Sequence, residues 1–229
     1  MERQRIVLVG TGTGIGKTHL AVALVRALAR AGAEVAGLKP VESGIGVGES
    51  DSSLLAAVAT FHVKQPAPYA LVAPISPHLA AAREGMTIRL GPIVRWVDSV
   101  DAAWLVVETA GGLLSPLAPG ITNLDLAATL APTQVVLVAS DRLGVLHDVT
   151  AALFALRQLA PGLPEAMVVL QAPGEDDAST GLNAAELLTL QIARRVASFP
   201  RGLAVDGPAQ AVTDALLEVL TGGGPETWV

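Results

Sequence analysis

Cysteine is absent from this chain of 229 residues, and aromatic residues make up only 3% of it. The lack of cysteine excludes disulfide bonds, thiolate nucleophiles and thiolate metal sites. With so few aromatic side chains, the core has to be built mainly from alanine, valine and leucine, within a hydrophobic fraction of 51%. Only 16% of the residues are charged, so the composition indicates a folded chain rather than a disordered one.

Basic residues are also in short supply. Lys and Arg number 15 against 21 Asp and Glu, which gives a formal net charge of −6. Nucleic acid and anionic membranes bind basic surfaces, so we expect neither as the main partner. No run of about 20 apolar residues escapes interruption by polar residues or proline. The N-terminal residues lack the pattern of a signal peptide, and we therefore expect a soluble cytoplasmic protein.

What the chain does contain is an alternation of short apolar runs with longer segments of helical character. Strands are expected at 5–10, 33–41, 102–112, 133–141 and 165–173. Helices are expected at 17–32, 50–59, 146–160, 183–196 and 208–220. Continuous apolar strands between helices indicate a mostly parallel sheet with helices on both faces. We expect a three-layer α/β fold in a single domain over 1–222, with 223–229 as a candidate disordered tail.

A glycine-rich stretch, VLVGTGTGIGKTHL, joins the first expected strand to the first expected helix. The strict phosphate-loop spelling needs glycine where Thr11 stands. Alternating glycines can nevertheless turn backbone N–H groups toward phosphate, at the positive end of the helix. Lys17 would reach the β- and γ-phosphates of ATP, and the Thr18 hydroxyl a Mg²⁺ ion. The alternative is a glycine-rich turn with an incidental Lys-Thr, which the order of strand, glycines and helix disfavours. A dinucleotide-binding loop is disfavoured because Ile15 takes the place of its third glycine.

Three further charged residues are expected at the same sheet edge. Glu108 ends a strand, and open α/β sheets bind ligands at the carboxyl ends of their strands. Asp51 lies at a loop-to-helix junction, where it is either a second Mg²⁺ ligand or a simple helix cap. Lys39 follows the second strand and either points toward the phosphate loop or is a solvated lysine before a turn.

Other short motifs follow the loop GTGTGIGKT in order along the chain: KPVESG (39–44), Ser50-Asp51, SPHLAAAREG (76–85), VETAGG (107–112) and Leu143-Gly144. Together they resemble the dethiobiotin synthetase family over nearly the whole chain, including the threonine in place of the first Walker glycine. The resemblance implies a P-loop NTPase-like homodimer. It would use MgATP to close a ureido ring on 7,8-diaminononanoate (diaminopelargonate) with CO₂, giving dethiobiotin, ADP and phosphate in biotin biosynthesis.

The resemblance also implies roles for matched residues. The catalytic residues would be Lys17 and Lys39. The nucleotide would contact Gly14, Ile15, Gly16, Lys17, Thr18, His19, Glu108, Gly111, Gln171, Ala172 and Pro200. The substrate would contact Thr13, Lys39, Ser43, Gly112, Leu143, Gly144 and Val145, the last three from the other subunit. Mg²⁺ would be held by Thr18, Asp51 and Glu108.

Several positions depart from the family pattern. Gly12 stands where aspartate is usual, Thr109 replaces a glycine after Glu108, and His147 replaces an asparagine. The pair Gln171-Ala172 replaces an Asn-Asp pair that reads the purine, so base selectivity is expected to be loose.

Two alternatives to the family reading remain open. One is a related P-loop ligase that amidates or carboxylates another substrate. The other is a nucleotide-switched dimer of the partition type, but such proteins usually carry a second lysine at the position of Gly12. Of the remaining histidines, His19 and His62 are interpreted as structural or surface residues, and His78 as a pocket or structural residue.

Overall fold

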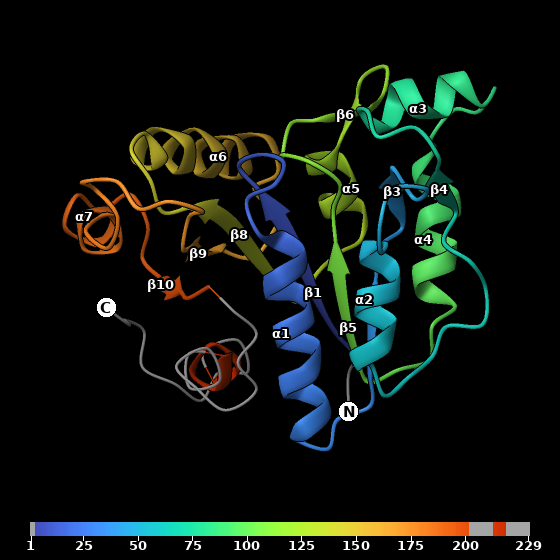
Figure 1. Cartoon of the computed structure of the whole chain (residues 1–229), viewed down its shortest axis with the longest axis horizontal. Coiled ribbons are helices and arrows are strands. Elements are labelled where there is room, and N and C mark those ends of the chain that lie inside the picture. The colour runs from blue at the N-terminus through green and yellow to red at the C-terminus, as the bar shows by residue number, and fades with distance from the viewer. Residues whose placement is uncertain (1–2, 202–212, 219–229) are drawn as a thin grey trace.

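In the computed structural model, which describes residues 3–201 and 213–218, a six-stranded sheet forms the centre of the molecule (Figure 1). Its strand order is β10-β9-β8-β1-β5-β2, and every neighbouring pair is parallel. The strands are β1 (Gln4–Gly10), β2 (Val35–Leu38), β5 (Trp104–Glu108), β8 (Gln134–Ser140), β9 (Met167–Gln171) and β10 (Val196–Phe199). The predicted α/β fold with a parallel sheet is therefore confirmed.

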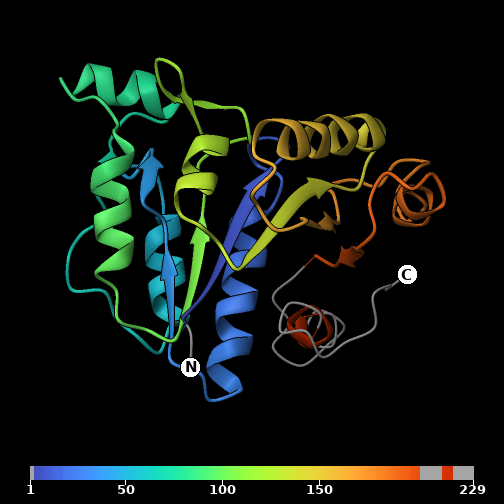
Figure 2. The same ribbon diagram turned by 180° about the vertical axis from the view of Figure 1, so that it is seen from behind.

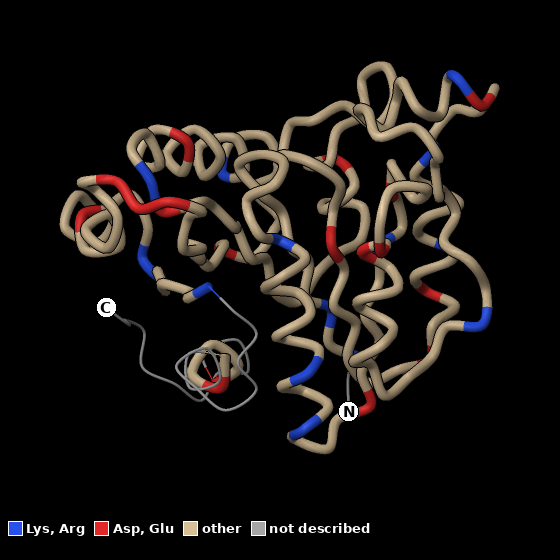
Figure 3. The backbone as a smooth tube through the Cα atoms, in the orientation of Figure 1, with Lys and Arg blue, Asp and Glu red and all other residues tan. Residues whose placement is uncertain are grey.

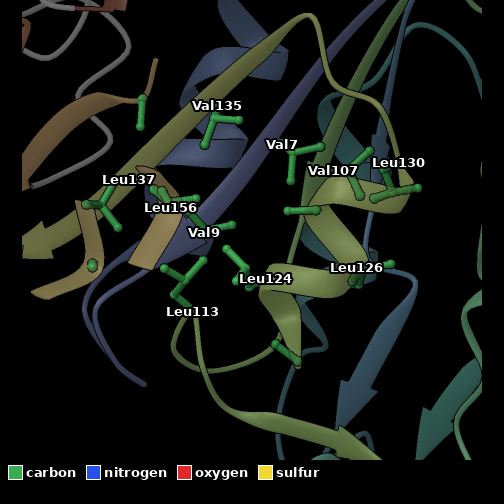
Figure 4. Packing of buried hydrophobic residues seen from close by; sticks show 14 of the residues in the cluster. Val7, Val9, Val107, Leu113, Leu124, Leu126, Leu130, Val135, Leu137 and Leu156 are labelled. Carbon is green, nitrogen blue, oxygen red and sulfur yellow. The ribbon is translucent and has the colours of Figure 1, made fainter. Parts of the chain in front are cut away.

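Strand β1 contributes buried side chains to both faces of the sheet. Its side chains alternate because successive residues of a strand point in opposite directions. Ile6 and Leu8 join one hydrophobic cluster, whereas Val7 and Val9 join the other. Figure 4 shows Val7 and Val9 packed within the second cluster. Burial on both faces explains why the strand is apolar at every position from Ile6 to Val9.

Helices cover both faces (Figures 1 and 2). The first face is covered by α1 (Lys17–Arg30) and α2 (Asp51–Val58). The opposite face is covered by α4 (Leu90–Asp98), α5 (Asn123–Thr129), α6 (Val145–Leu159) and α7 (Asn183–Thr189). The remaining elements are α3 (Pro77–Arg83) and two short strand pairs, β3 (Val41–Ser43) with β4 (Tyr69–Leu71) and β6 (Pro116–Ala118) with β7 (Ile121–Thr122).

A glycine in β2 sets how closely the first two helices approach the sheet. A Cβ atom added at Gly37 would lie 2.9 Å from the Leu55 Cβ and 3.2 Å from the Val25 Cγ2. Real Cβ atoms do not come this close to a neighbour, so any larger residue would push α2 outward. The close approach holds the first turn of α2, which carries Asp51, near the sheet edge.

The predicted strand 33–41 is divided in two. β2 ends at Leu38, and the chain then leaves the central sheet, because proline at position 40 has no N–H to donate to a ladder. β3 follows at once and pairs with β4 instead. The break places Lys39 in the connection between the two strands.

The predicted helix 183–196 is wrong in its C-terminal part. Helix α7 ends at Thr189, Gln191 takes a φ of +54°, and β10 begins at Val196. Val196 and Phe199 are buried beside β9, so sheet pairing overrides the helical pattern at this end. Helices α4 and α5 were not predicted.

Only part of the predicted C-terminal helix lies within the described residues. Of the expected helix 208–220, the structure describes 213–218, which is helical. The expected tail 223–229 lies outside the described residues. Within the described residues, no helix is both long and apolar enough for a membrane span. Figure 3 shows the Lys and Arg positions scattered along the described backbone.

Candidate functional site

The glycine loop takes the shape that its sequence predicts. After β1 the chain turns through Gly14 and Gly16, whose φ angles are +70° and +89°, and α1 begins at Lys17. Glycine adopts these left-handed angles without the steric cost that a side chain brings. At Gly10 an added Cβ would lie 2.7 Å from the Ile15 Cδ1 and 2.9 Å from the Lys17 Cδ. The loop therefore folds tightly over the start of α1.

Below the loop, Lys39 lies between two carboxylates. Its Nζ is 2.5 Å from the Glu108 Oε1 and 2.9 Å from the Asp51 Oδ2. Lys39 is 5% exposed and Glu108 is 1% exposed. The predicted convergence of these three residues is confirmed, and Lys39 is not a solvated lysine. Asp51 starts α2, but Ser50 is its N-cap and accepts from the Ser53 N–H, so a capping role does not account for Asp51.

These residues line a cavity of about 370 Å³, which we call the lysine cavity. It is lined by Thr13, Gly14, Gly16, Lys17, Thr18, Lys39, Glu42, Ser43, Asp51, Glu108, Ala110 and Gly111. The Lys17 Nζ lies beside it and donates to the Gly12 carbonyl at 2.8 Å. Both predicted catalytic lysines and all three predicted metal ligands therefore meet in one place.

Burial and charge shift the pKa values of the lysine cavity. Burial, and then the neighbouring Lys39, lower the pKa of Lys17 to about 8. Burial alone would lower the pKa of Lys39, but the Glu108 and Asp51 carboxylates together raise it above its usual value. Burial raises the pKa of Glu108, and the Lys39 ammonium opposes that shift. Lys17 is thus the more easily deprotonated of the two lysines.

The donor set fits a hard cation. The Thr18 hydroxyl donates to the Glu108 Oε1 at 3.0 Å, while the buried Glu108 Oε2 has no hydrogen-bond partner within the described residues. No group of three or more His, Cys, Asp or Glu among those residues is arranged to hold a metal. Mg²⁺ is usually held by one or two carboxylates with substrate phosphates and water, which two carboxylates and a hydroxyl can support.

On the other side of Gly16 lies a cavity of about 480 Å³, which we call the glutamine cavity. It is lined by Gly14, Ile15, Gly16, His19, Ser140, Gln171, Ala172, Pro173, Gly174 and Arg201. The Gln171 Nε2 donates to the carbonyls of Phe199 and Pro200, both at 3.2 Å. Its Oε1 lies 3.1 Å from the His19 Nδ1. Both amide hydrogens of Gln171 are therefore bonded to the protein.

His19 combines a structural role with a place at the cavity wall. Its ring meets the Phe199 ring edge-on, with centroids 5.3 Å apart and an interplanar angle of 68°. The aliphatic part of Gln171 packs on the loop, since an added Cβ at Gly16 would lie 2.5 Å from the Gln171 Cγ. Together His19 and Gln171 connect the loop, β9 and the end of β10.

The expected substrate residues lie in three places. Thr13 and Ser43 line the lysine cavity, whereas Gly112 lines a third cavity of about 480 Å³ beside α6, with His147 and Leu114. The segment Leu143, Gly144 and Val145 lines neither the lysine nor the glutamine cavity.

Leu143 is 76% exposed, and its N–H donates to the Asp177 Oδ2 at 2.7 Å. Hydrogen bonds from Ser179 and from the Leu143 N–H lower the pKa of Asp177 to about 2. The segment 174–181 is thus tied to the start of α6, where Gly144 takes a φ of +95°.

Sequence reasoning missed two polar residues that shape the lysine cavity. The buried Glu42 accepts hydrogen bonds from the first turn of α2. The fully buried Asn123 donates to the carbonyls of Ala110 and Gly112 and so holds the turn after β5. Glu42 lay within the KPVESG motif and could have been found there, whereas Asn123 carried no local signal. Thr109, which departs from the family pattern, donates its hydroxyl to the Leu8 carbonyl at 3.0 Å and leaves the turn intact.

Comparisons with known proteins identify the family. A family model described as an AAA domain matches residues 4–209. An ATP-dependent dethiobiotin synthetase BioD from Anaeromyxobacter dehalogenans (strain 2CP-C) is 40% identical over 201 residues, which cover 85% of this chain and 89% of that relative. The chain belongs to the dethiobiotin synthetase family. It is accordingly an ATP-dependent ligase that forms a carbon–nitrogen bond in biotin synthesis.

Solved structures confirm the P-loop fold of this dethiobiotin synthetase family member. The MinC:MinD cell division protein complex of Aquifex aeolicus matches with a TM-score of 0.62 and 13% identity, covering 96% of both chains. Cobyrinic acid a,c-diamide synthase of Mycobacterium smegmatis, with bound ADP and magnesium, matches with a TM-score of 0.56 and 15% identity, covering 100% of this chain and 99% of that one. At such low identity these matches establish the fold alone.

Proposed function

We propose that this protein closes the ureido ring of dethiobiotin from 7,8-diaminononanoate, CO₂ and ATP, releasing ADP and phosphate. The observation that carries the proposal is the position of Lys39, buried between Asp51 and Glu108 in the cavity below the glycine loop. Thr13 and Ser43 line the same cavity. It therefore offers cationic and hydroxyl groups side by side, next to a loop suited to phosphate.

The reaction has three steps. One amine of the substrate captures CO₂ as a carbamate and loses a proton. A carbamate oxygen then attacks the γ-phosphate, which gives a carbamic-phosphoric anhydride and ADP. The second amine attacks the carbamate carbonyl, and phosphate leaves as the ring closes. No covalent bond to the protein is needed, so positioning and charge neutralisation are its main tasks.

In this proposal Lys17 and Lys39 neutralise the carbamate and the transferred phosphoryl group. The ion pairs with Asp51 and Glu108 keep the Lys39 Nζ protonated and fixed in place. Thr13 and Ser43 hold the reacting end of the substrate. Thr18, Asp51 and Glu108 hold Mg²⁺, which when bound neutralises charge on the phosphates. The unpartnered Glu108 Oε2 supports that assignment.

The rest of the site follows the family resemblance. The nucleotide base lies in the glutamine cavity, against Gln171, Ala172 and Pro200. The protein acts as a cytoplasmic homodimer of one domain per chain, and the α6 N-terminus at Leu143–Val145 receives the substrate carboxylate from the other subunit. Leu143 is strongly exposed and does not line the lysine cavity of its own chain, which supports a role across subunits.

An assay with diaminopelargonate, bicarbonate and MgATP tests the proposal. We expect dethiobiotin and one ADP for each ring closed. If no dethiobiotin forms at any pH, the proposed substrate is wrong. ATP turnover with a different amine would then favour a related ligase of the same P-loop group.

A further inference from the structure

Glu42 is a buried acid of the lysine cavity to which neither the reaction nor the family motifs assign a role. It is 6% exposed and lies on β3, three residues after Lys39. No ion pair of Glu42 with a lysine is found in the part of the chain that the structure describes. Its charge is therefore not used to neutralise Lys17 or Lys39.

Both oxygens of Glu42 are directed at one helix end. The Oε1 accepts from the Asp51 N–H at 2.6 Å, and the Oε2 accepts from the Ser52 N–H at 3.2 Å. These N–H groups have no partner within α2, because the first turn of a helix lacks preceding carbonyls. A carboxylate in this position is stabilised by hydrogen bonds and by the helix dipole.

The consequence is a rigid link between the two sides of the lysine cavity. Lys39 lies in the connection that leads into β3, three residues before Glu42, and Glu42 accepts a hydrogen bond from the backbone N–H of Asp51. The hydrogen bonds of Glu42 to the start of α2 thus help to set the separation of 2.9 Å between the Lys39 Nζ and the Asp51 Oδ2. Without Glu42, the carboxylate of Asp51, which is 36% exposed, would keep its ion pair, but the start of α2 would lose its hydrogen bonds to β3.

We propose that Glu42 is a positioning residue that sets Asp51 in place for Mg²⁺ and for Lys39. The proposal rests on the proposed function, in which Asp51 is a metal ligand. Because each of its oxygens accepts from a backbone N–H at the start of α2, we assign Glu42 a role through Asp51 and not a place among the metal ligands. Residues that orient a metal ligand typically contribute about 10- to 100-fold to metal affinity.

The test compares Glu42→Gln with Ser50→Ala in the full-length protein. The Ser50 Oγ caps the same helix by accepting from the Ser53 N–H at 3.2 Å, but it does not connect α2 to β3. Binding of a non-hydrolysable ATP analogue is titrated with Mg²⁺ in the absence of the amine substrate. We expect Glu42→Gln to raise the Mg²⁺ concentration for half-maximal binding about tenfold. Ser50→Ala should lower the melting temperature without changing that concentration.

The outcomes separate the two roles. Equal shifts in both variants, or no shift in Glu42→Gln, would overturn the positioning role and leave Glu42 as a helix cap only. If Glu42→Gln does not fold, Glu42→Asp is tested in its place. An unchanged Mg²⁺ concentration for half-maximal binding in Glu42→Asp would also overturn the proposal. If the unmodified protein bound the analogue equally well with and without Mg²⁺, the proposed magnesium site would be wrong. The proposal for Glu42 would then be wrong as well.

Discussion

The lysine cavity and the glutamine cavity lie on opposite sides of Gly16, yet they hold their polar side chains in different ways. In the lysine cavity, one buried oxygen of Glu108 has no hydrogen-bond partner among the described residues. In the glutamine cavity, the Gln171 amide donates both of its hydrogens to backbone carbonyls and faces His19 with its oxygen. A buried group without a partner is costly unless a ligand completes it, whereas a satisfied group stabilises the fold. The protein thus satisfies the Gln171 amide but not the Glu108 carboxylate, and the buried His19 Nε2 beside Gln171 also has no hydrogen-bond partner among the described residues.

The largest effect is expected from Lys39→Ala. This change removes the cation between Asp51 and Glu108, which in the proposed mechanism also neutralises the transferred phosphoryl group. Turnover should fall about 10³-fold, the upper range for loss of one electrostatic donor in a catalytic site. Steady-state assays of dethiobiotin formation measure the loss.

Lys64→Ala is the matched control for Lys39→Ala, because Lys64 is exposed and lines none of the three cavities. Circular dichroism verifies that both variants fold, since two unpaired carboxylates also destabilise the cavity. If Lys39→Ala kept turnover within tenfold of the unmodified protein, its catalytic assignment would be wrong.

A smaller effect is expected when Lys17 is titrated. Its pKa of about 8 lies below the ordinary lysine value, so the charged form predominates below pH 8 and is lost above it. Phosphate binding requires the charged form. The affinity for ATP should therefore be constant below pH 8 and fall by up to about tenfold per pH unit above it.

Calorimetry of ATP binding across this pH range measures the effect, with proton uptake expected on binding above pH 8. In Lys17→Arg the guanidinium remains protonated, so the affinity for ATP should not change with pH. This affinity should be lower than that of the unmodified protein. A flat profile in the unmodified protein would contradict the lowered pKa.

The features that sequence predicted correctly are those set by neighbouring residues. The apolar run of β1, the glycines of the loop and the first residues of α1 are adjacent in the chain, and their geometry follows from local preferences. The sheet edge where Glu108 and Lys39 meet also follows, because parallel strands bring their carboxyl ends together. Their ion pair joins residues 69 positions apart and still agrees with the prediction.

The features that were missed depend on distant partners. Strand β10 exists because Val196 and Phe199 are buried beside β9, and no local pattern distinguishes that segment from a helix end. Asn123 has its role only because the turn after β5 folds onto α5. The orientation of the Gln171 amide depends on carbonyls 28 and 29 residues away.

The smallest effect is expected from Gln171→Ala, and it separates the two cavities most directly. Family resemblance predicts that Gln171 reads the base. In the structure, however, the Gln171 Nε2 donates to the Phe199 and Pro200 carbonyls. The ratio of ATP to GTP dissociation constants should then change by less than about threefold, which is below the value of one neutral hydrogen bond. The melting temperature should fall, because two carbonyls and His19 lose a partner. Equilibrium binding of both nucleotides measures the ratio. A tenfold change in this ratio would mean that the Gln171 amide turns toward the base when the nucleotide binds. Polar groups of both cavities would then bind ligand.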